Sequence, residues 1–340
     1  MIKNYISTCY FPSTVMFIDD SRDFLLNFTL QLDPNIAYKL YHSPYDALEA
    51  IHAAHQPEYL DHRCLTEYLD TSSCPVNNYT INLDLASIHW EVYNPQRFSE
   101  VSVVCIDYAM PGMNGLDFCK KMANSPIKRI LLTGKADEKL AVQAFNEGII
   151  DIYLQKQDPD VTNRINEAIK NMQQRYFQSM SDIIVRMLSI NSPSCLQDAN
   201  FIELFNKIIT ENHIVEYYLT ESSGSYLMLD IDGNLSFLIV KNRQDLKLYY
   251  EMALDNKAPQ KVLDELKSGE KIPYFWHPSD YYQNNWENWH NYLYPAIQLN
   301  GNTDYYYAYI KDKPPNAGIQ PNKILSYNNY LERLDEMAEE

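Results

Sequence analysis

The chain has 340 residues, of which 46% are apolar and 21% charged, and its formal net charge is −17 at pH 7. This composition excludes a chain that is disordered throughout, and the length suits about two domains of 100 to 200 residues. An acidic chain repels nucleic acid phosphates, and no cluster of five or more basic residues occurs. We therefore expect no binding to nucleic acid.

The cysteine content and the hydropathy pattern indicate a cellular compartment. Six cysteines are too sparse for a disulfide scaffold. No run of 18 apolar residues occurs, and the first ten residues lack the basic region and apolar core of a signal peptide. We expect a reduced, cytoplasmic protein with no membrane-spanning segment.

Short apolar runs alternate with helical segments between residues 13 and 158. Ser21 is suited to cap the first of the predicted helices. The alternation predicts a flavodoxin-like, doubly wound parallel sheet, in which ligands bind at the carboxyl ends of the strands. The five predicted strands cover residues 15–18, 36–41, 101–106, 129–132 and 150–154.

An insertion is expected between the second helix and the third strand. Helices of about 11 residues, strands of about five and short connections would place about 44 residues between the first and third strand ends. The interval from Asp20 to Asp107 is 87 residues. We place the insertion near residues 56–100 and expect a packed extension or a partner-binding surface. A metal site is less favoured, because no two candidate ligands have the spacing of metal ligands on one helix or strand. The candidate ligands are His62, Cys64, Cys74 and His89.

Polar residues follow four of the five predicted strands. Asp19 and Asp20 end the first strand, Asp107 ends the third, Thr133 ends the fourth and Lys156 follows the fifth. Taken singly, each residue could cap a helix, end a strand or carry a solvated charge. Because the carboxyl ends of parallel strands meet at one edge of the sheet, their joint placement predicts a common site.

At these positions the sequence resembles the receiver domain of bacterial two-component response regulators. The resemblance covers the first half of the chain, with Tyr153 three residues before Lys156. Gln157 stands where most receivers have a proline after a cis peptide bond. The matching motifs are Phe17-Ile18-Asp19-Asp20, Asp107-Tyr108-Ala109-Met110-Pro111-Gly112-Met113-Asn114-Gly115, Leu132-Thr133-Gly134 and Lys156.

The resemblance implies a metal site and a phosphoacceptor. Asp20 and Asp107 would bind Mg²⁺ directly, Asp19 would bind it through water, and the backbone carbonyl of Ala109 would complete the ligand set. Asp107 would accept the phosphoryl group as a nucleophile.

The resemblance also implies a switch. Lys156 would neutralise charge on the transferred oxygens. Thr133 would donate its hydroxyl to the phosphoryl group, and the resulting loop movement would let Tyr153 change rotamer.

Residues 160–190 lack glycine and proline, which predicts one long connecting helix. At 1.5 Å per residue it would run about 45 Å, past the edge of a receiver. Its apolar stripe suits either a coiled seam between two copies or packing against the second domain of the same chain. The stripe comprises Val161, Ile165, Ala168, Met172, Ser179, Ile183 and Met187.

Residues 191–340 alternate predicted hairpins with helices, an α+β order that is loosely similar to sensory PAS domains. They hold 16 of the 28 tyrosines. That content suits a ligand pocket or a protein interface, and equally a small core filled by large side chains. We recognise no separate catalytic domain, so the expected enzymatic activity is autophosphorylation and autodephosphorylation of the receiver alone.

The sequence thus predicts a receiver domain over residues 1–159, a connecting helix over 160–190 and an output domain over 191–340. We expect a phosphorylation-activated response regulator that receives its phosphoryl group from a sensor histidine kinase or a phosphotransfer protein. Its output would bind an unknown protein or small molecule, and the helix could form a homodimer. The alternatives are a phosphorylation-independent scaffold with a receiver fold, and a ligand-binding or enzymatic output gated by the receiver.

Overall fold

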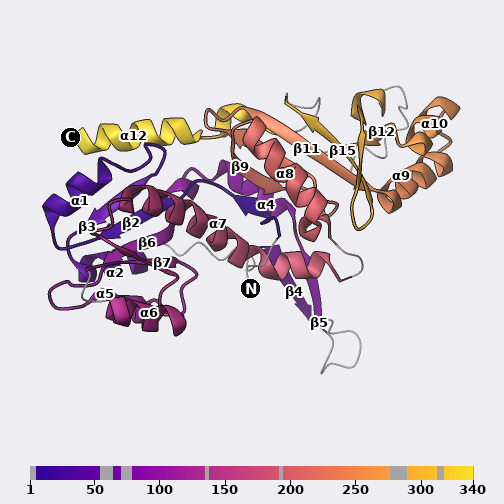
Figure 1. Cartoon of the computed structure of the whole chain (residues 1–340). Helices are drawn as coiled ribbons and strands as arrows, with labels where there is room; N and C mark the ends of the chain where they lie inside the picture. Colours follow the sequence, from indigo (N-terminus) through magenta and orange to yellow (C-terminus); the bar gives the residue numbers. More distant parts are fainter. Residues whose placement is uncertain are drawn as a thin grey trace. The chain divides into compact units, whose positions relative to one another are not determined.

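The computed structural model describes residues 5–53, 64–69, 79–134, 138–190, 194–275, 289–311 and 318–339 (Figure 1). The chain folds into two compact units. The parallel-sheet unit comprises Phe11–His62, Pro95–Ser181 and Tyr330–Glu340. The antiparallel-sheet unit comprises Met1–Tyr10, Arg63–Asn94 and Asp182–Asn329.

The parallel-sheet unit contains the predicted five-stranded sheet, in the order β3-β2-β6-β7-β8. Every neighbouring pair in it is parallel. The flavodoxin-like receiver fold is therefore confirmed. The strands are β2 (Thr14–Ile18), β3 (Tyr38–Tyr41), β6 (Val101–Asp107), β7 (Lys128–Thr133) and β8 (Ile152–Gln155).

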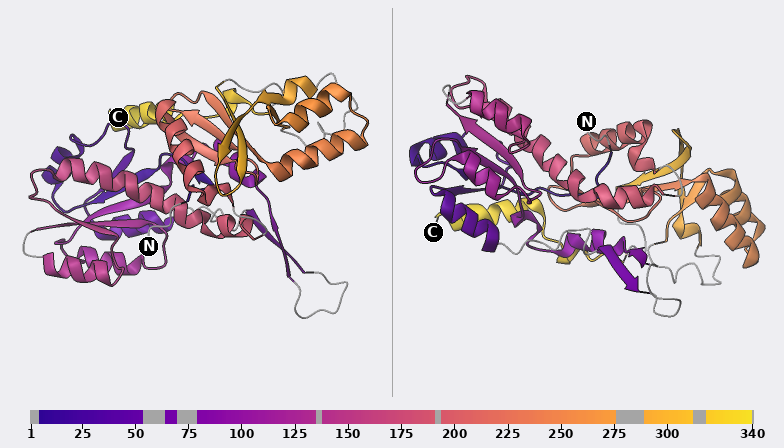
Figure 2. Two further views of the ribbon diagram at one scale, coloured as in Figure 1. Left: turned by 45° about the vertical axis from the view of Figure 1, so that its right-hand side comes forward. Right: turned by 90° about the horizontal axis from the view of Figure 1, so that it is seen from below.

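Helices cover both faces of this sheet (Figures 1 and 2). α1 and α7 bury their apolar sides against one face, in a core that includes Val15, Phe28 and Ile165. The side chain of Ser21 caps α1 by accepting a hydrogen bond from the amide of Phe24, as predicted. The helices are α1 (Arg22–Thr29), α2 (Pro44–Ala53), α5 (Gly115–Lys121), α6 (Glu138–Asn146) and α7 (Val161–Leu188).

The long helix α7 uses only part of the predicted stripe. Ile165, Ala168 and Met172 are buried in the core of the parallel-sheet unit, whereas Ser179 and Ile183 are exposed. Beyond Met172 the buried positions shift along the helix to Tyr176, Phe177, Met180, Ile184 and Val185. This burial favours packing within one chain over a free seam along the first half of the helix.

The antiparallel-sheet unit contains a six-stranded sheet in the order β1-β9-β10-β11-β15-β14. The antiparallel pairs β10–β11 and β14–β15 are hairpins, as the predicted alternation of hairpins and helices requires, but β9 was not predicted. The likeness to PAS domains stays a prediction. The strands are β1 (Cys9–Tyr10), β9 (Ile214–Leu219), β10 (Tyr226–Asp230), β11 (Leu235–Asn242), β14 (Ile297–Asn300) and β15 (Asp304–Ile310).

This unit also contains helices and a small two-stranded sheet. β12 (Lys271–Pro273) pairs with β13 (Leu293–Pro295). Among the residues that the structure describes, no helix of either unit is both long and apolar enough to cross a membrane. Four of the further helices are α8 (Ala199–Glu211), α9 (Arg243–Asp255), α10 (Gln260–Ser268) and α12 (Tyr327–Glu339), the last of which ends in the parallel-sheet unit.

The two units are interleaved along the chain, unlike the consecutive domains expected over residues 1–159 and 191–340. The physical reason is strand pairing, because β1 forms the edge of the antiparallel sheet by pairing with β9. Most of the described insertion also belongs to this unit: β4 (Leu65–Leu69) pairs with β5 (Tyr79–Leu83), and α4 (Ala86–Trp90) contacts β9.

The candidate metal ligands of the insertion are only partly described. His62 and Cys74 lie outside the described residues. Cys64 is buried, and burial lowers the pKa of His89 to about 4. The less favoured metal site in the insertion therefore stays untested, because two of its four candidate ligands are not described.

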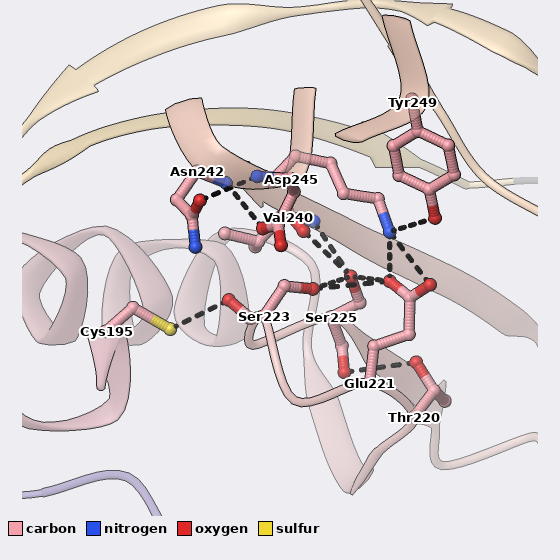
Figure 3. Close-up of polar contacts among 10 residues, drawn as sticks. Cys195, Thr220, Glu221, Ser223, Ser225, Val240, Asn242, Asp245 and Tyr249 are labelled. Carbon is pink, nitrogen blue, oxygen red and sulfur yellow. Dashed lines mark hydrogen bonds and ion pairs between the residues drawn. The ribbon is translucent and has the colours of Figure 1, made fainter. Parts of the chain in front are cut away.

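A buried ion pair connects β11 to the loop between β9 and β10. The ammonium nitrogen of Lys241, a residue only 2% exposed, lies 2.8 and 2.7 Å from the two carboxylate oxygens of Glu221. Figure 3 shows Ser225 and Tyr249 beside this carboxylate. The Ser225 hydroxyl donates to Glu221 at 2.6 Å, and the Tyr249 hydroxyl lies 3.5 Å from the Lys241 nitrogen. These contacts fix the loop to the central strand of the sheet.

Candidate receiver phosphorylation site

The strand register brings the predicted site residues to one edge of the parallel sheet. Ile18 pairs with Ile106 in neighbouring strands, so Asp19 and Asp107 follow at the same level. On the other side of β6, Asp107 pairs with Leu132, the residue before Thr133. The sheet order β2-β6-β7 therefore places these polar residues side by side.

Three carboxylates converge at this edge. One oxygen from each of Asp19, Asp20 and Asp107 lies within 4.8 Å of the others. Asp19 and Asp107 are buried, whereas Asp20 is exposed. Burial raises the pKa of Asp19, although hydrogen bonds from Lys156 and from the Ser21 amide oppose that shift. Oxygen ligands in this arrangement suit a hard divalent cation such as Mg²⁺.

Lys156 reaches the acids from the segment after β8. Its ammonium nitrogen lies 2.6 Å from Asp19 Oδ2 and 2.8 Å from Asp107 Oδ1. Its backbone amide donates to the carbonyl of Thr133 at 3.0 Å, which ties this segment to β7. The peptide bond to Gln157 is trans. Lys156 thus contacts Asp19 and Asp107 although Gln157 replaces the proline that is usual in receivers.

Thr133 carries a buried hydroxyl that has no hydrogen-bond partner within the described part of the chain. An unsatisfied buried hydroxyl costs about 1 to 3 kcal/mol, so such groups usually have a purpose. At the rim of the acid cluster, it is suited to donate to an anion. Tyr153 lies on β8 opposite Leu131 and is partly buried. It is not a member of the acid cluster.

The loop after β6 carries Ala109, which is exposed to solvent. The Tyr108 amide donates to the Leu132 carbonyl at 2.9 Å, and the Gly115 amide donates to the Tyr108 carbonyl at 3.0 Å. These bonds hold the loop at the edge of the sheet on which the acids lie.

Sequence reasoning missed two residues that support the site. The Lys156 ammonium lies 4.4 Å from the centre of the Phe24 ring, a cation–π contact from α1. The Tyr45 hydroxyl donates to the Gly112 carbonyl at 3.2 Å, bracing the Ala109 loop from the first turn of α2. α1 and α2 both begin at the carboxyl edge of the sheet. This position was the sequence signal that could have identified Phe24 and Tyr45.

We predict that Gly115→Ala destabilises the parallel-sheet unit by about 1 to 3 kcal/mol. An added Cβ would clash with the backbone carbonyl oxygen of Asp107 and lie 2.9 Å from Leu131 Cδ1. Gly148→Ala is the control because its Cβ meets nothing within 4 Å, and only its φ of +70° is strained. Thermal unfolding measures both. Equal losses in the two variants would contradict the close-approach argument.

Comparisons with known proteins agree with the fold. A family model described as the response regulator receiver domain matches residues 67–170. The solved structure of the Legionella pneumophila response regulator LqsR is similar to this chain, with 50% sequence identity and a TM-score of 0.81. The alignment covers 98% of this chain and 97% of that one. The chain therefore belongs to the response regulator family of two-component signalling proteins.

A curated relative has a narrower match. The transcriptional regulatory protein FixJ of Bradyrhizobium diazoefficiens is 29% identical over 139 residues, which are 38% of this chain and 67% of FixJ. The family model begins inside the insertion and so leaves out β2 with Asp19 and Asp20. In the structure β2 pairs with β6, which places these acids beside the end of β6.

Proposed function

We propose that Asp107 accepts a phosphoryl group from a sensor histidine kinase or a phosphotransfer protein, and that phosphorylation controls the output. The observation that carries this proposal is the cluster of three carboxylate oxygens within 4.8 Å, with the Lys156 ammonium 2.8 Å from Asp107. Lys156 compensates one of the three negative charges, and a divalent cation would compensate the other two. Asp20 and Asp107 would hold Mg²⁺ directly, with Asp19 through water and the carbonyl of Ala109.

Each residue of the site has its own role in phosphoryl transfer. A carboxylate oxygen of Asp107 attacks the phosphorus, and the bond from phosphorus to the donor atom breaks, leaving an acyl phosphate. Bound Mg²⁺ would neutralise charge on the transferred oxygens. The Lys156 ammonium shares that task from the protein side. Hydrolysis of the acyl phosphate returns Asp107 to its free carboxylate and ends the signal.

Thr133 connects this chemistry to a conformational switch. Its hydroxyl, which has no partner among the described residues, donates to the phosphoryl oxygens. The predicted inward movement falls on the loop after β7, of which residues 135–137 lie outside the described residues. Tyr153 on the neighbouring strand then changes rotamer. The output of such a regulator binds an unknown protein or small molecule and does not contact DNA.

We predict that chelating divalent metal abolishes phosphorylation. The unmodified chain is incubated with acetyl phosphate in Mg²⁺ or in EDTA, and its intact mass is measured. We expect one phosphoryl group per chain with Mg²⁺ and none with EDTA, because the carboxylates otherwise repel the incoming anion. Equal uptake in EDTA would contradict the metal site. No uptake in either condition would favour the phosphorylation-independent scaffold.

We also predict that Thr133→Ala changes stability little, because removal of a buried hydroxyl that has no partner in the described structure offsets the loss of the buried γ-methyl group. The variant is nevertheless expected to lose the conformational response to the phosphoryl mimic beryllofluoride with Mg²⁺. Hydrogen exchange of the loop after β7 measures that response, and Thr133→Ser is the control that keeps the hydroxyl. An unchanged response in Thr133→Ala would remove this residue from the switch.

The homodimer through residues 160–190 stays a prediction. The core of the parallel-sheet unit covers Ile165 and Met172, so a seam would have to use the exposed side of the helix, where Ile183 is 46% exposed. Light scattering after gel filtration, with and without phosphorylation, measures the mass. A monomer in both conditions would exclude the seam.

A further inference from the structure

Helix α8 covers only part of one face of the antiparallel sheet. Tyr305, Tyr307 and Tyr309 alternate along β15 and therefore point to the same face. The Tyr305 ring packs against Phe201 of α8 with 6.1 Å between ring centres, and Tyr305 is buried. Tyr307 and Tyr309 are only partly buried. The described residues thus cover the far end of this strand face only in part.

A groove of about 490 Å³ lies between α8 and the end of β15. Leu204 and Ile208 form its apolar wall on the helix, and Tyr307 and Tyr309 form the opposite wall on the strand. Its volume falls within the range of about 300 to 1,000 Å³ of small-molecule sites. One wall is aliphatic and the other offers phenol rings with hydroxyl groups. A ligand that fits both has an apolar, ring-containing body.

Two lysines and one glutamate, Glu211, line the groove, which leaves it with a net positive charge. Lys207 comes from α8, and Lys311 follows β15. Lys207 has a weak partner in Glu211, 3.9 Å away, and Lys311 makes no ion pair with a residue in the described ranges. Residues 191–340 hold 12 basic and 22 acidic side chains, so two lysines that line one groove are unusual in this acidic half of the chain. They favour a ligand that carries a negative charge.

We propose that this groove binds a small amphipathic anion, with a ring-containing apolar body between the helix and strand walls and one carboxylate or phosphate group beside Lys207 and Lys311. No residue of the phosphorylation site takes part, so the proposal goes beyond the function proposed above. It makes the output of this regulator a small-molecule binding module.

The test uses the full unphosphorylated chain without Mg²⁺, which separates it from the receiver chemistry. The probe is 2-naphthoate, titrated by isothermal calorimetry, with 2-naphthamide as the uncharged analogue of the same shape. We expect saturable binding of one 2-naphthoate with a dissociation constant below about 1 mM. The amide is expected to bind about tenfold more weakly, since it lacks the charge that the lysines attract.

Substitutions then locate the site. Lys207→Gln together with Lys311→Gln is expected to weaken 2-naphthoate binding about tenfold and to leave the amide unchanged. Lys247→Gln is the matched control because Lys247 also pairs with a glutamate four residues on, Glu251, but on α9. Leu204→Glu, which places an acid in the apolar wall, should abolish binding of both probes.

Absence of saturable binding would overturn the proposal. So would equal affinity for the charged and uncharged probes, or an equal loss of affinity in Lys247→Gln.

Discussion

We expect Asp107→Asn to abolish transfer of a phosphoryl group to the chain. An asparagine amide has nearly the shape of the carboxylate but is not a nucleophile that forms an acyl phosphate. Lys156 keeps its 2.6 Å contact with Asp19 in the variant, so the edge of the sheet should stay ordered. The parent chain and the variant are incubated with Mg²⁺ and acetyl phosphate, and intact mass is measured. We expect one added phosphoryl group on the parent and none on the variant.

The control for this experiment is Asp46→Asn. Asp46 lies in the first turn of α2, at the same edge of the sheet, but it is outside the cluster of Asp19, Asp20 and Asp107. Its substitution should leave uptake unchanged. Continued uptake by Asp107→Asn would move the phosphoacceptor elsewhere. Loss of uptake in Asp46→Asn as well would mean that general negative charge, and not one nucleophile, governs the reaction.

Glu221→Gln is expected to destabilise the antiparallel-sheet unit by about 3 to 5 kcal/mol. The substitution keeps the side-chain shape but leaves the Lys241 ammonium, in a residue that is 2% exposed, without its counter-charge. Tyr249, at 3.5 Å, offers only a neutral oxygen in exchange. Removing one partner of a buried ion pair costs much more than the pair contributes, because the other charge stays buried.

Thermal unfolding followed by circular dichroism measures this loss. Glu251→Gln is the matched control because it breaks a solvent-exposed pair with Lys247, and exposed pairs contribute about 0 to 1 kcal/mol. A double variant, Glu221→Gln with Lys241→Met, removes both charges and should recover much of the stability. Equal effects of Glu221→Gln and Glu251→Gln would show that Lys241 is hydrated and not held by Glu221.

Much of the parallel-sheet unit could be predicted because its signals are local. Each strand is a short apolar run next to an amphipathic helix, and Ser21 marks the start of α1. The site followed from the same pattern, since Asp19, Asp107 and Lys156 stand at strand ends. β9 escaped prediction because its two tyrosines and the buried Glu216 hide the alternation that marks a strand.

By itself the sequence determined the order of strands and helices in the first half and the acids that end those strands, because side-chain periodicity and helix capping act over a few residues. Only the tertiary structure decided that Cys9 and Tyr10 pair with β9, that Glu221 meets Lys241, and that α8 leaves a groove beside Tyr309. These contacts join residues distant in the chain. Their free energy depends on burial and pairing in the folded state, and no local pattern encodes such pairings.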